Sequence, residues 1–537
     1  MDHHRQPVFA DTADNTTEAA VIPVSRTIIH KVYTSTTPAT FLAVVLLALA
    51  SNVIWTWYRL RHIPGPLWAC WSKYWQIKTQ FQGNWYLELK KVGDQYGELF
   101  RVGPNQLMTT DVDVVRRMAY TKSAYTRGPF YQTFRYLPNQ DHSFSLLDDA
   151  EHTRRRTLLG PGYAGGAHLE SCVDRQCARL VDLIERKFIS TPTEYRPIDM
   201  TLISSLFTMD CIGDLSFGGD FGGLDEGVDI YNFIKWNEEF FVTAVVVSNY
   251  HWLIKIASKP FFNRVYPTVN DKEGIGKFIP IAIRAVEERL AKDGEGRKDA
   301  LSLFIDHGVN KQDAINELLV QLVAGADPVA AAIRMTLLFL TSNPKSYDKL
   351  KAEIDDAVTK GAVSSPIKDA EARQLPYLQA VIKEGVRTFP VVTATLFKKV
   401  PKGGDVINGY FVPEGTEVGH NVLGIMRSPK YWGDDADVFR PERWIEADKK
   451  TFDMMSGVLE TLWGSGRFKC LGRVVASMEM NKVFVELLRR FDFSVAKPHD
   501  SVKILNPGFF LMSEMNMRVT KRDDFVSQGV EGENEEQ

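Results

Sequence analysis

Hydrophobic residues form two long blocks along the chain. Residues 39–58 (ATFLAVVLLALASNVIWTWY) contain no charged side chain over about the length that an α-helix needs to cross a bilayer. Residues 313–344 are apolar on nearly every helical face, which is typical of a helix buried on all sides. Gly325 and Pro328 near its middle predict an interruption and a kink. The pattern therefore predicts one membrane-spanning helix and one central core helix, at about residues 313–342.

Shorter patterns predict the remaining architecture. Residues 375–389 have a helical period that ends at Pro390, and residues 473–493 predict another helix that begins just after Cys470. Residues 406–425 alternate β-branched and small residues around turn signals, which predicts a short sheet. We therefore expect a mainly α fold with small β-sheets.

The chain has no internal repeat and no Pro/Ser/Gly-rich linker between residues 67 and 520, which predicts one large domain. Two prolines around Gly65 prevent the first helix from continuing and predict an extended connector. The predicted segments are a polar tail (1–38), a transmembrane anchor (39–58), a basic, proline-containing hinge (59–66), the large domain (67–520) and an acidic tail (521–537).

The first apolar block is interpreted as a retained anchor. It starts too late and is too long for a cleaved signal peptide, and it lacks a small-residue cleavage site. Arg59, Arg61 and His62 follow it directly, so the positive-inside rule predicts a single-pass protein with its large domain on the cytosolic side. Asn15 begins an Asn-Thr-Thr sequon that would be lumenal in this orientation and open to glycosylation.

Charge and cysteine content exclude several classes of protein. The net charge of −3 and the lack of basic runs with interleaved aromatics argue against nucleic-acid binding. Five cysteines at irregular spacing, without a CxxC pair, argue against a disulfide framework or a zinc site. Most of these thiols are expected to be small buried hydrophobes in a reducing compartment.

Cys470 is the exception because of its surroundings, WGSGRFKCLGR (Trp463–Arg473). Basic residues and the start of a helix favour the thiolate. Three glycines allow backbone amides to approach the sulfur and donate hydrogen bonds, as a thiolate metal ligand requires. A nucleophilic cysteine is the competing interpretation, although no histidine lies nearby in sequence to act as its base.

Further motifs precede this loop in a fixed order. KEGVR places Glu384 and Arg387 at i, i+3 on one helix face, where they can pair. FRPERW supplies Arg443, and AGAD (324–327) stands within the central helix. In this order the chain resembles the cytochrome P450 family of heme-thiolate monooxygenases, and FGGDFGG (217–223) with the PERW box resembles its fungal microsomal members. The resemblance implies the family's α-rich fold.

The resemblance assigns roles around the cofactor. It makes Cys470 the proximal ligand of the iron of heme b, and it makes Glu384, Arg387 and Arg443 a structural triad that braces the cysteine loop. The helix of EHTRRRTLLGPGY (151–163) resembles the one that meets the heme propionates. The implied cofactor-binding residues are His152, Arg156, Arg467, Gly466 and Lys398.

The sequence departs from the family pattern in three places. Trp463 replaces a phenylalanine, and Phe468 stands where arginine or histidine is common, so that Arg467 would take over propionate pairing. Lys398 stands where an arginine contact is common, and lysine lacks the planar fork of a guanidinium.

The third departure concerns oxygen activation. Ala324, Gly325 and Asp327 match the oxygen-binding stretch of the central helix, but Pro328 and Val329 replace the hydroxyl residues that follow it. General acid–base help is typically worth about 100- to 10,000-fold in rate. We hypothesise either substrate-assisted oxygen activation or a desaturation, rearrangement or radical coupling. The alternative is that water substitutes and the enzyme hydroxylates normally.

The resemblance implies a monooxygenase that oxidises a hydrophobic small molecule, such as a terpenoid, polyketide or alkaloid intermediate of fungal secondary metabolism. Val391, Val392 and Thr393 resemble the substrate-lining strand. The chain has no flavin or Rossmann motif, so electrons would come from NADPH–cytochrome P450 reductase at the endoplasmic reticulum membrane. The predicted docking residues are Lys469, Arg473 and Lys482.

Two other functional classes remain open. A heme-thiolate isomerase or dehydratase would need neither dioxygen nor a reductase, and NADPH dependence separates it from a monooxygenase. A non-catalytic heme-binding protein would keep Cys470 but form no product.

Overall fold

The computed structural model describes residues 38–291 and 299–522, which divide into two units, one that ends at Thr56 and one that begins at Trp57. Helix α2 (Pro38–Leu60) carries the predicted span, and the connector after it leads to α3 (Leu67–Trp71). Asn15 with the polar tail, and residues 523–537 of the acidic tail, lie outside the described residues.

Two described helices are long and apolar enough to cross a membrane, α2 and α15 (Lys311–Thr341). About two thirds of the apolar window of α15 is buried inside the protein, as expected of a core helix, whereas the corresponding window of α2 is exposed. Of the helices in the described part of the chain, α2 therefore remains as the candidate anchor.

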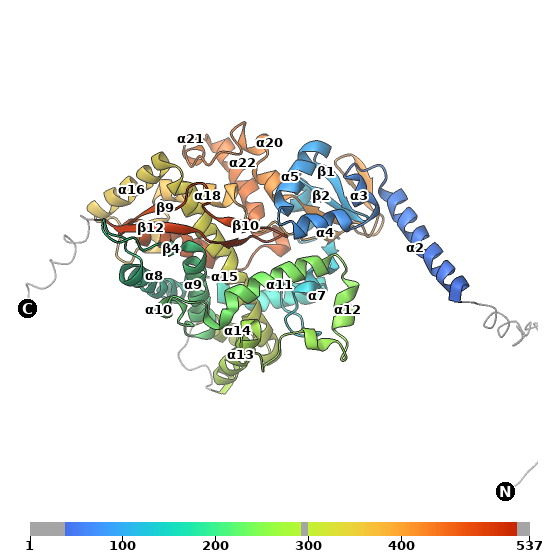
Figure 1. Ribbon diagram of the computed structural model, residues 1–537, viewed down its shortest axis with the longest axis horizontal. Coiled ribbons are helices and arrows are strands. Elements are labelled where there is room, and N and C mark those ends of the chain that lie inside the picture. Colours follow the sequence, from blue (N-terminus) through green and yellow to red (C-terminus); the bar gives the residue numbers. More distant parts are fainter. Residues whose placement is uncertain (1–37, 292–298, 523–537) are drawn as a thin grey trace, which may run out of the picture. The chain divides into compact units, whose positions relative to one another are not determined.

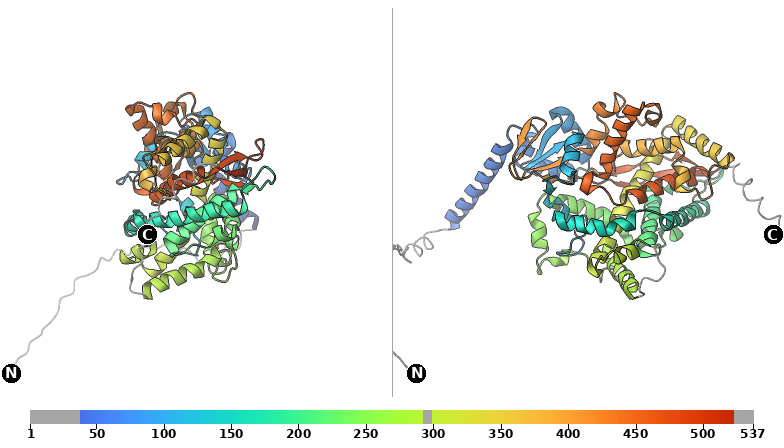
Figure 2. Two further views of the ribbon diagram at one scale, coloured as in Figure 1. Left: turned by 90° about the vertical axis from the view of Figure 1, so that its left-hand side faces the viewer. Right: turned by 180° about the vertical axis from the view of Figure 1, so that it is seen from behind.

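The second unit is mainly helical (Figures 1 and 2). Its first helices after α3 are α4 (Tyr74–Phe81), α5 (Trp85–Tyr96), α6 (Val112–Ala119), α7 (Asp149–Leu159), α8 (Ala167–Lys187), α9 (Met200–Ile212), α10 (Gly223–Glu226), α11 (Phe233–Ser248), α12 (Trp252–Ala257), α13 (Gly274–Ala291) and α14 (Ala300–Asp306). After α15 come α16 (Pro344–Thr359), α17 (Asp369–Ala372), α18 (Pro376–Thr388), α19 (Val422–Met426), α20 (Pro429–Trp432), α21 (Arg443–Glu446), α22 (Lys449–Leu459) and α23 (Arg473–Leu488).

Small sheets complete the unit. The largest has the strand order β1 (Leu99–Gly103), β2 (Gln106–Thr109), β8 (Glu417–His420), β5 (Lys398–Lys399) and β3 (Thr126–Arg127), with only β2 and β8 parallel. The others are β4 (Ile198–Asp199), β12 (Asn516–Lys521) and β9 (Phe491–Val495), then β10 (Lys503–Leu505) with β11 (Leu511–Ser513), and β6 (Asp405–Ile407) with β7 (Tyr410–Val412). The predicted short sheet at 406–425 is therefore a separate hairpin followed by a strand of the largest sheet.

Helix α15 runs through the middle of the second unit (Figure 1). Asn310 caps its start by accepting a hydrogen bond from the backbone N–H of Asp313. It packs along α9, which is buried over almost its whole length. The predicted interruption is wrong, because α15 continues as one helix through Pro328. Packing on several sides outweighs the one hydrogen bond that proline removes.

The helix after Cys470 is shorter than predicted. Helix α23 ends at Leu488, and Phe491–Val495 forms strand β9, which pairs with β12. The apolar spacing continues past the helix because alternate strand residues are also buried, so the change of element leaves little trace in the pattern.

Candidate active site

Glu384, Arg387 and Arg443 form one buried ionic cluster, as predicted. The carboxylate of Glu384 accepts two hydrogen bonds from Arg387, at 2.7 and 2.9 Å, and one from Nε of Arg443 at 3.0 Å. Trp444 donates its indole N–H to the same carboxylate at 3.0 Å, and Arg440 donates its backbone N–H at 2.9 Å. With both oxygens shared in this way, the buried charge is fully compensated.

The cluster fixes the chain that leads to the cysteine loop. Arg387 donates to the carbonyls of Met426, Ala436 and Val438 at 2.6–2.9 Å. Arg443 binds the carboxylate of Asp435 at 2.9 Å. The end of α19 and the irregular chain after α20 are thus held by side chains of α18 that are themselves locked.

The cysteine loop bends through two 3₁₀ turns, η6 (Glu460–Trp463) and η7 (Gly466–Phe468), before α23 begins. Gly464 and Gly466 have φ of +74° and +52°, a region that favours glycine. A side chain on Gly466 would collide with the carbonyl of Ala119. The N–H of Cys470 donates to the carbonyl of Trp463 at 2.6 Å, which closes the loop.

The thiol of Cys470 lies in a recess. Its side chain is exposed, yet surrounding protein withdraws it from bulk water, and this desolvation raises the pKa of the thiol. The backbone N–H of Gly472, the guanidinium of Arg156 and the backbone N–H of Arg473 oppose that rise. The start of α23 and Arg156 of α7 therefore favour the thiolate form of Cys470.

Beside the loop lies a cluster of cations around the ring of Phe468. Antiparallel pairing of β3 with β5 places Arg127 directly opposite Lys398. Arg127, Lys398 and Arg467 lie 5.0, 4.4 and 4.8 Å from the centre of the Phe468 ring. Opposed like charges destabilise a sheet, and burial together with this repulsion lowers the pKa of Lys398 far below its ordinary value.

His152 joins this cluster from α7. Its Nε2 lies 2.7 Å from Nη2 of Arg127, and because a guanidinium only donates, Nε2 must accept and Nδ1 carries the proton. Burial and the neighbouring positive charges, chiefly Arg127, lower the pKa of His152 to about 2. The imidazole is therefore neutral, with its Nδ1–H free to donate.

The predicted oxygen-binding residues lie in the middle of α15. Ala324 is exposed although Val323 and Ala326 beside it are buried, so Ala324 lies on an accessible side of the helix. Gly325 packs so closely on Ile212 of α9 that a side chain there would collide with it.

Asp327 forms an ion pair with Arg334. Its carboxylate accepts from Arg334 at 3.3 Å, and Arg334 also donates to the hydroxyl of Ser205 at 3.1 Å. Burial raises the pKa of Asp327, and Arg334 opposes the rise.

Comparison with known sequences decides the family. The sequence model of the family described as Cytochrome P450 matches residues 62–520. The chain belongs to the cytochrome P450 family. Its fold is accordingly that of a P450, and its activity is that of a monooxygenase. P450 enzymes bind heme through a cysteine thiolate.

Several fungal relatives support this assignment. This P450 is 39% identical over 492 residues to cytochrome P450 monooxygenase ABA1 of Pyricularia oryzae, covering 90% of this chain and 96% of the relative. It is 37% identical over 470 residues to cytochrome P450 monooxygenase aba1 of Botryotinia fuckeliana, covering 86% and 92%. Identity to cytochrome P450 monooxygenase abl1 of Leptosphaeria maculans is 33% over 473 residues, covering 85% and 83%.

The cation cluster of this P450 fits a group that carries carboxylates. Nε of Arg127, Nε of Arg467 and Nδ1 of His152 are buried without hydrogen-bond partners. Among residues 38–291 and 299–522, Asp149 is the only carboxylate paired with these cations, through Arg467 at 3.2 Å. Unused donors and uncompensated positive charge match the two propionates of heme.

Arg156 has a different contact from the one predicted for it. Its Nη2 donates to the carbonyl of Lys469 at 2.6 Å, next to Cys470. His152 and Arg156 thus both reach the cysteine-loop side, as their i, i+4 spacing suggested, but Arg156 is bonded to the loop backbone.

The three residues predicted to contact the substrate differ in their exposure. Val391 and Val392 are half-buried, and Val392 forms an isolated bridge with Phe509. Thr393 is buried, and its hydroxyl is bonded to Asn506 and to the carbonyl of Gly508, each at 3.1 Å. Only the two valines therefore keep accessible surface.

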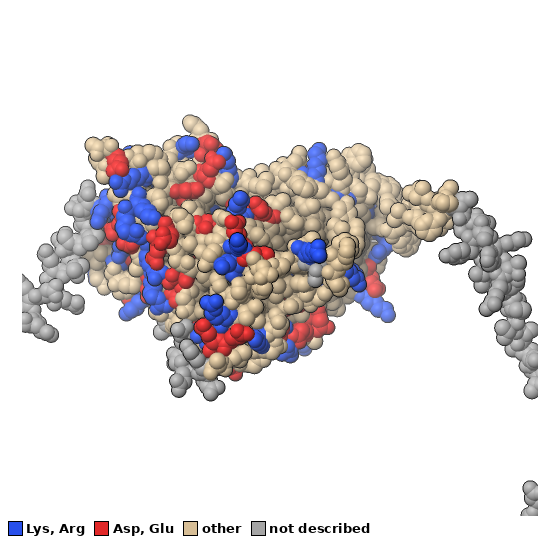
Figure 3. All heavy atoms as spheres, turned by 60° about the horizontal axis from the view of Figure 1, so that its bottom comes forward, with Lys and Arg blue, Asp and Glu red and all other residues tan. Residues whose placement is uncertain are grey.

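The prediction that Lys482 lies on the docking surface is wrong. Lys482 is fully buried and pairs with Glu170 at 2.9 Å and Asp174 at 2.8 Å, because α23 packs against α8 on that face. Lys469 and Arg473 are partly exposed and pair with Glu460. On the face shown in Figure 3, basic and acidic side chains are interspersed, in keeping with the small net charge.

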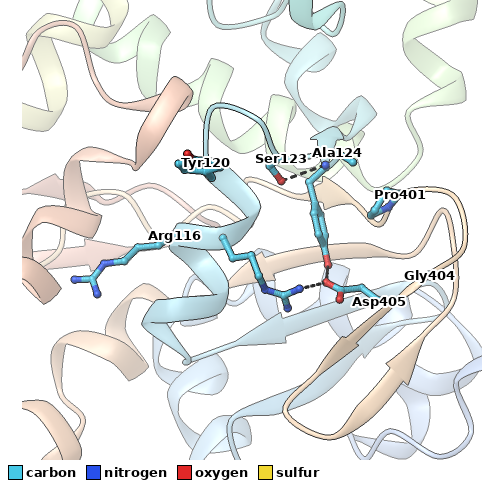
Figure 4. Close-up of a pocket in the computed structure, with 9 residues that line it drawn as sticks. Arg116, Tyr120, Ser123, Ala124, Pro401, Gly404 and Asp405 are labelled. Carbon is cyan, nitrogen blue, oxygen red and sulfur yellow. Dashed lines mark hydrogen bonds and ion pairs between the residues drawn. The ribbon is translucent and has the colours of Figure 1, made fainter.

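A surface pocket of about 480 Å³ lies beside the loop, lined by Arg116, Arg117, Tyr120, Ser123, Ala124, Tyr125, Pro401, Gly404 and Asp405. Arg117 pairs with Asp405 at 2.5 Å, whereas Arg116 points away from Asp405 (Figure 4). The carbonyl of Tyr125 accepts from Arg467. Tyr125, which lines this pocket, therefore holds Arg467 of the cation cluster in place.

Sequence reasoning missed Arg127, Tyr131 and Asp149. Arg127 stands in TRGPF without any periodic signal, and its role depends on the register of β3 against β5. Tyr131 accepts a hydrogen bond from Lys398, and burial raises the pKa of its phenol to about 12. Only the acidic start of α7 hinted at Asp149, as a helix N-terminal charge.

Proposed function

We propose that this P450 is a membrane-anchored monooxygenase of a hydrophobic small molecule, with heme b ligated by the thiolate of Cys470. The observation that carries the proposal is the cysteine recess beside a buried, uncompensated cation cluster. When bound, the heme supplies the activation of dioxygen and the transfer of one oxygen atom to the substrate.

The residues of the chain have defined parts in this proposal. The backbone N–H groups of Gly472 and Arg473 favour the thiolate of Cys470, because both lower the pKa of its thiol. Arg156 holds the loop through the carbonyl of Lys469. Glu384, with Arg387 and Arg443, keeps the approach to the loop rigid without touching the reacting atoms.

The remaining cofactor and substrate roles follow from position. Arg127, Arg467, Lys398 and the Nδ1–H of His152 bind the propionates, and Gly466 allows the tight turn that brings Arg467 into place. Ala324 borders the proposed oxygen side of the heme site, Gly325 lets α15 pack closely on Ile212 behind it, and Asp327, paired with Arg334, would assist proton transfer. Val391 and Val392 contact the substrate, and Thr393 fixes their strand.

The natural substrate is proposed to be a terpenoid, polyketide or alkaloid intermediate of fungal secondary metabolism, since the similar relatives are fungal P450 monooxygenases. Electrons come from NADPH–cytochrome P450 reductase, which docks near the partly exposed Lys469 and Arg473. We expect α2 to anchor the protein in the endoplasmic reticulum membrane, with the catalytic unit on the cytosolic face; the apolar, exposed surface of α2 supports this.

The anchor has a direct test. Deleting residues 1–56 keeps Leu60, which is fully buried, and should move the protein from the membrane pellet to the supernatant in high salt. A deletion variant that stays in the pellet to the same extent as the full chain would contradict the anchor.

The reaction is tested with the full chain, the reductase and NADPH under ¹⁸O₂, against a panel of terpenoid and polyketide intermediates. We expect products that carry one ¹⁸O atom and whose formation requires NADPH. Product that forms without NADPH would instead favour a heme-thiolate isomerase or dehydratase. Heme binding without product or NADPH oxidation would favour a non-catalytic role.

Oxygen activation in this enzyme is proposed to be atypical because Pro328 has no hydroxyl. Pro328→Thr restores the side chain that the family pattern has at this position. Turnover, product and peroxide release should change in this variant. If all three are unchanged, ordered water already supplies the missing proton donor.

A further inference from the structure

Pro328 leaves a backbone acceptor open in the middle of α15. In an α-helix the carbonyl of residue i accepts from the N–H of residue i+4. Proline has no N–H, so the carbonyl of Ala324 lacks this partner although the helix continues through both residues. An open carbonyl inside a protein costs free energy unless another donor reaches it.

This carbonyl lies on the accessible side of the helix. Residues i and i+4 of a helix share one face, so the missing backbone hydrogen bond lies between Ala324 and Pro328 on that face. Ala324 is exposed and Pro328 half-buried, whereas Val323, Ala326 and Ala330 are buried. A small molecule beside this face of α15 can therefore approach the carbonyl.

The nearby chain offers no side-chain donor for it. Residues 323–333 (VAGADPVAAAI) carry a single polar side chain, the Asp327 carboxylate, which is itself an acceptor and pairs with Arg334. Thr208 of α9 donates its hydroxyl to the carbonyl of Ala326 instead. The acceptor is thus left for a ligand.

We propose that the Ala324 carbonyl binds a hydroxyl group of the substrate, and that this P450 selects molecules bearing a hydroxyl near the carbon that is oxidised. The inference rests on the proposed function, since it places the substrate against this face of α15. A site with a buried polar group in need of a partner rejects the analogue that lacks that partner. The substrate hydroxyl would also supply a proton donor to the segment of α15 in which Pro328 and Val329 replace the hydroxyl residues of the family pattern.

The test measures binding rather than turnover. Two probe pairs, 1-adamantanol with adamantane and borneol with bornane, differ within each pair by one hydroxyl. Their dissociation constants are measured by equilibrium dialysis on heme-loaded wild type, on Pro328→Ala and on Val329→Ala. Pro328→Ala restores a backbone N–H that can donate to the Ala324 carbonyl. Val329→Ala shortens the neighbouring side chain and leaves the backbone hydrogen bonds of α15 unchanged.

We expect the preference for the alcohol over its hydrocarbon to fall about five- to tenfold in Pro328→Ala for at least one pair, the effect of one hydrogen bond. Hydrocarbon affinity should change less than about twofold, and Val329→Ala should keep the wild-type preference. The same preference in all three proteins, for both pairs, would overturn the proposal and leave ordered water as the occupant. The wild-type spectrum under carbon monoxide, recorded on the same samples, fails only if the proposed heme site itself is wrong.

Discussion

Single residues at this site are arranged to offset buried charge. Glu384 lies between two guanidinium groups and accepts five hydrogen bonds, and none of the three charged side chains is exposed by more than a few per cent. Removing one member of such a cluster leaves buried charge uncompensated, which costs more than the cluster contributes as a whole. The cation cluster near Phe468 is the opposite case, with positive charge in excess.

Glu384→Gln should therefore be severely destabilising. Buried Arg387 would lose its carboxylate and Arg443 would keep only that of Asp435, so we expect the free energy of unfolding in urea to fall by about 3–5 kcal/mol. Glu446→Gln is the matched control, because Glu446 pairs with Arg440 on the surface and should cost less than about 0.5 kcal/mol. Similar losses in both variants would refute the bracing role of the triad.

Glu238 on α11 predicts a pH-dependent contribution to stability. Burial and the charge of Asp327 raise the pKa of its carboxyl to about 7, with Asp229 and Glu239 adding to the rise and Arg334 opposing it. The folded state thus binds the proton more tightly than the unfolded chain, so stability falls as pH rises from about 4.5 through 7.

Glu238→Gln removes this penalty. Its melting temperature should match that of wild type at pH 5 and exceed it by about 1–3 °C at pH 8. Melting curves at the two pH values check this, and an equal difference at both would show that the carboxyl does not titrate in this range.

Elements are positioned by close helix packing along α15. Gly325 contacts Ile212 of α9, and Gly385 of α18 contacts Thr336 of α15, each without room for a side chain. The sequence predicted α15 and α18 from periodicity alone. It could not predict that α15 stays continuous through Pro328, because the packing that holds it comes from α9, far away in sequence.

Gly385→Ala tests this packing. The new methyl group would collide with the Thr336 side chain, and overpacking of this kind typically costs about 1–3 kcal/mol. Gly160→Ala, at a helical position with open space around it, should change stability by less than about 0.5 kcal/mol. Urea unfolding of both variants measures the difference, and an unaffected Gly385→Ala protein would mean that α15 and α18 can separate without cost.

At the scale of the whole molecule, the fold class and the order of motifs followed from the sequence. Local patterns with a fixed spacing, such as Glu384 with Arg387, were predictable because one helix turn sets their geometry. Arg127 opposite Lys398 was not, because it depends on which strands pair. Lys482 was misjudged for the same reason, since a charged residue on a helix is buried only when other helices supply its partners.

In the function proposed above, Cys470 holds a heme through its thiolate. The most direct measurement is the absorption spectrum of the membrane-expressed protein, reduced with dithionite under carbon monoxide, for wild type beside Cys470→Ala. We expect a strongly red-shifted Soret band in wild type that is absent from the variant. A folded, heme-supplied wild type without that band, or a variant that keeps it, would show that Cys470 does not ligate the heme.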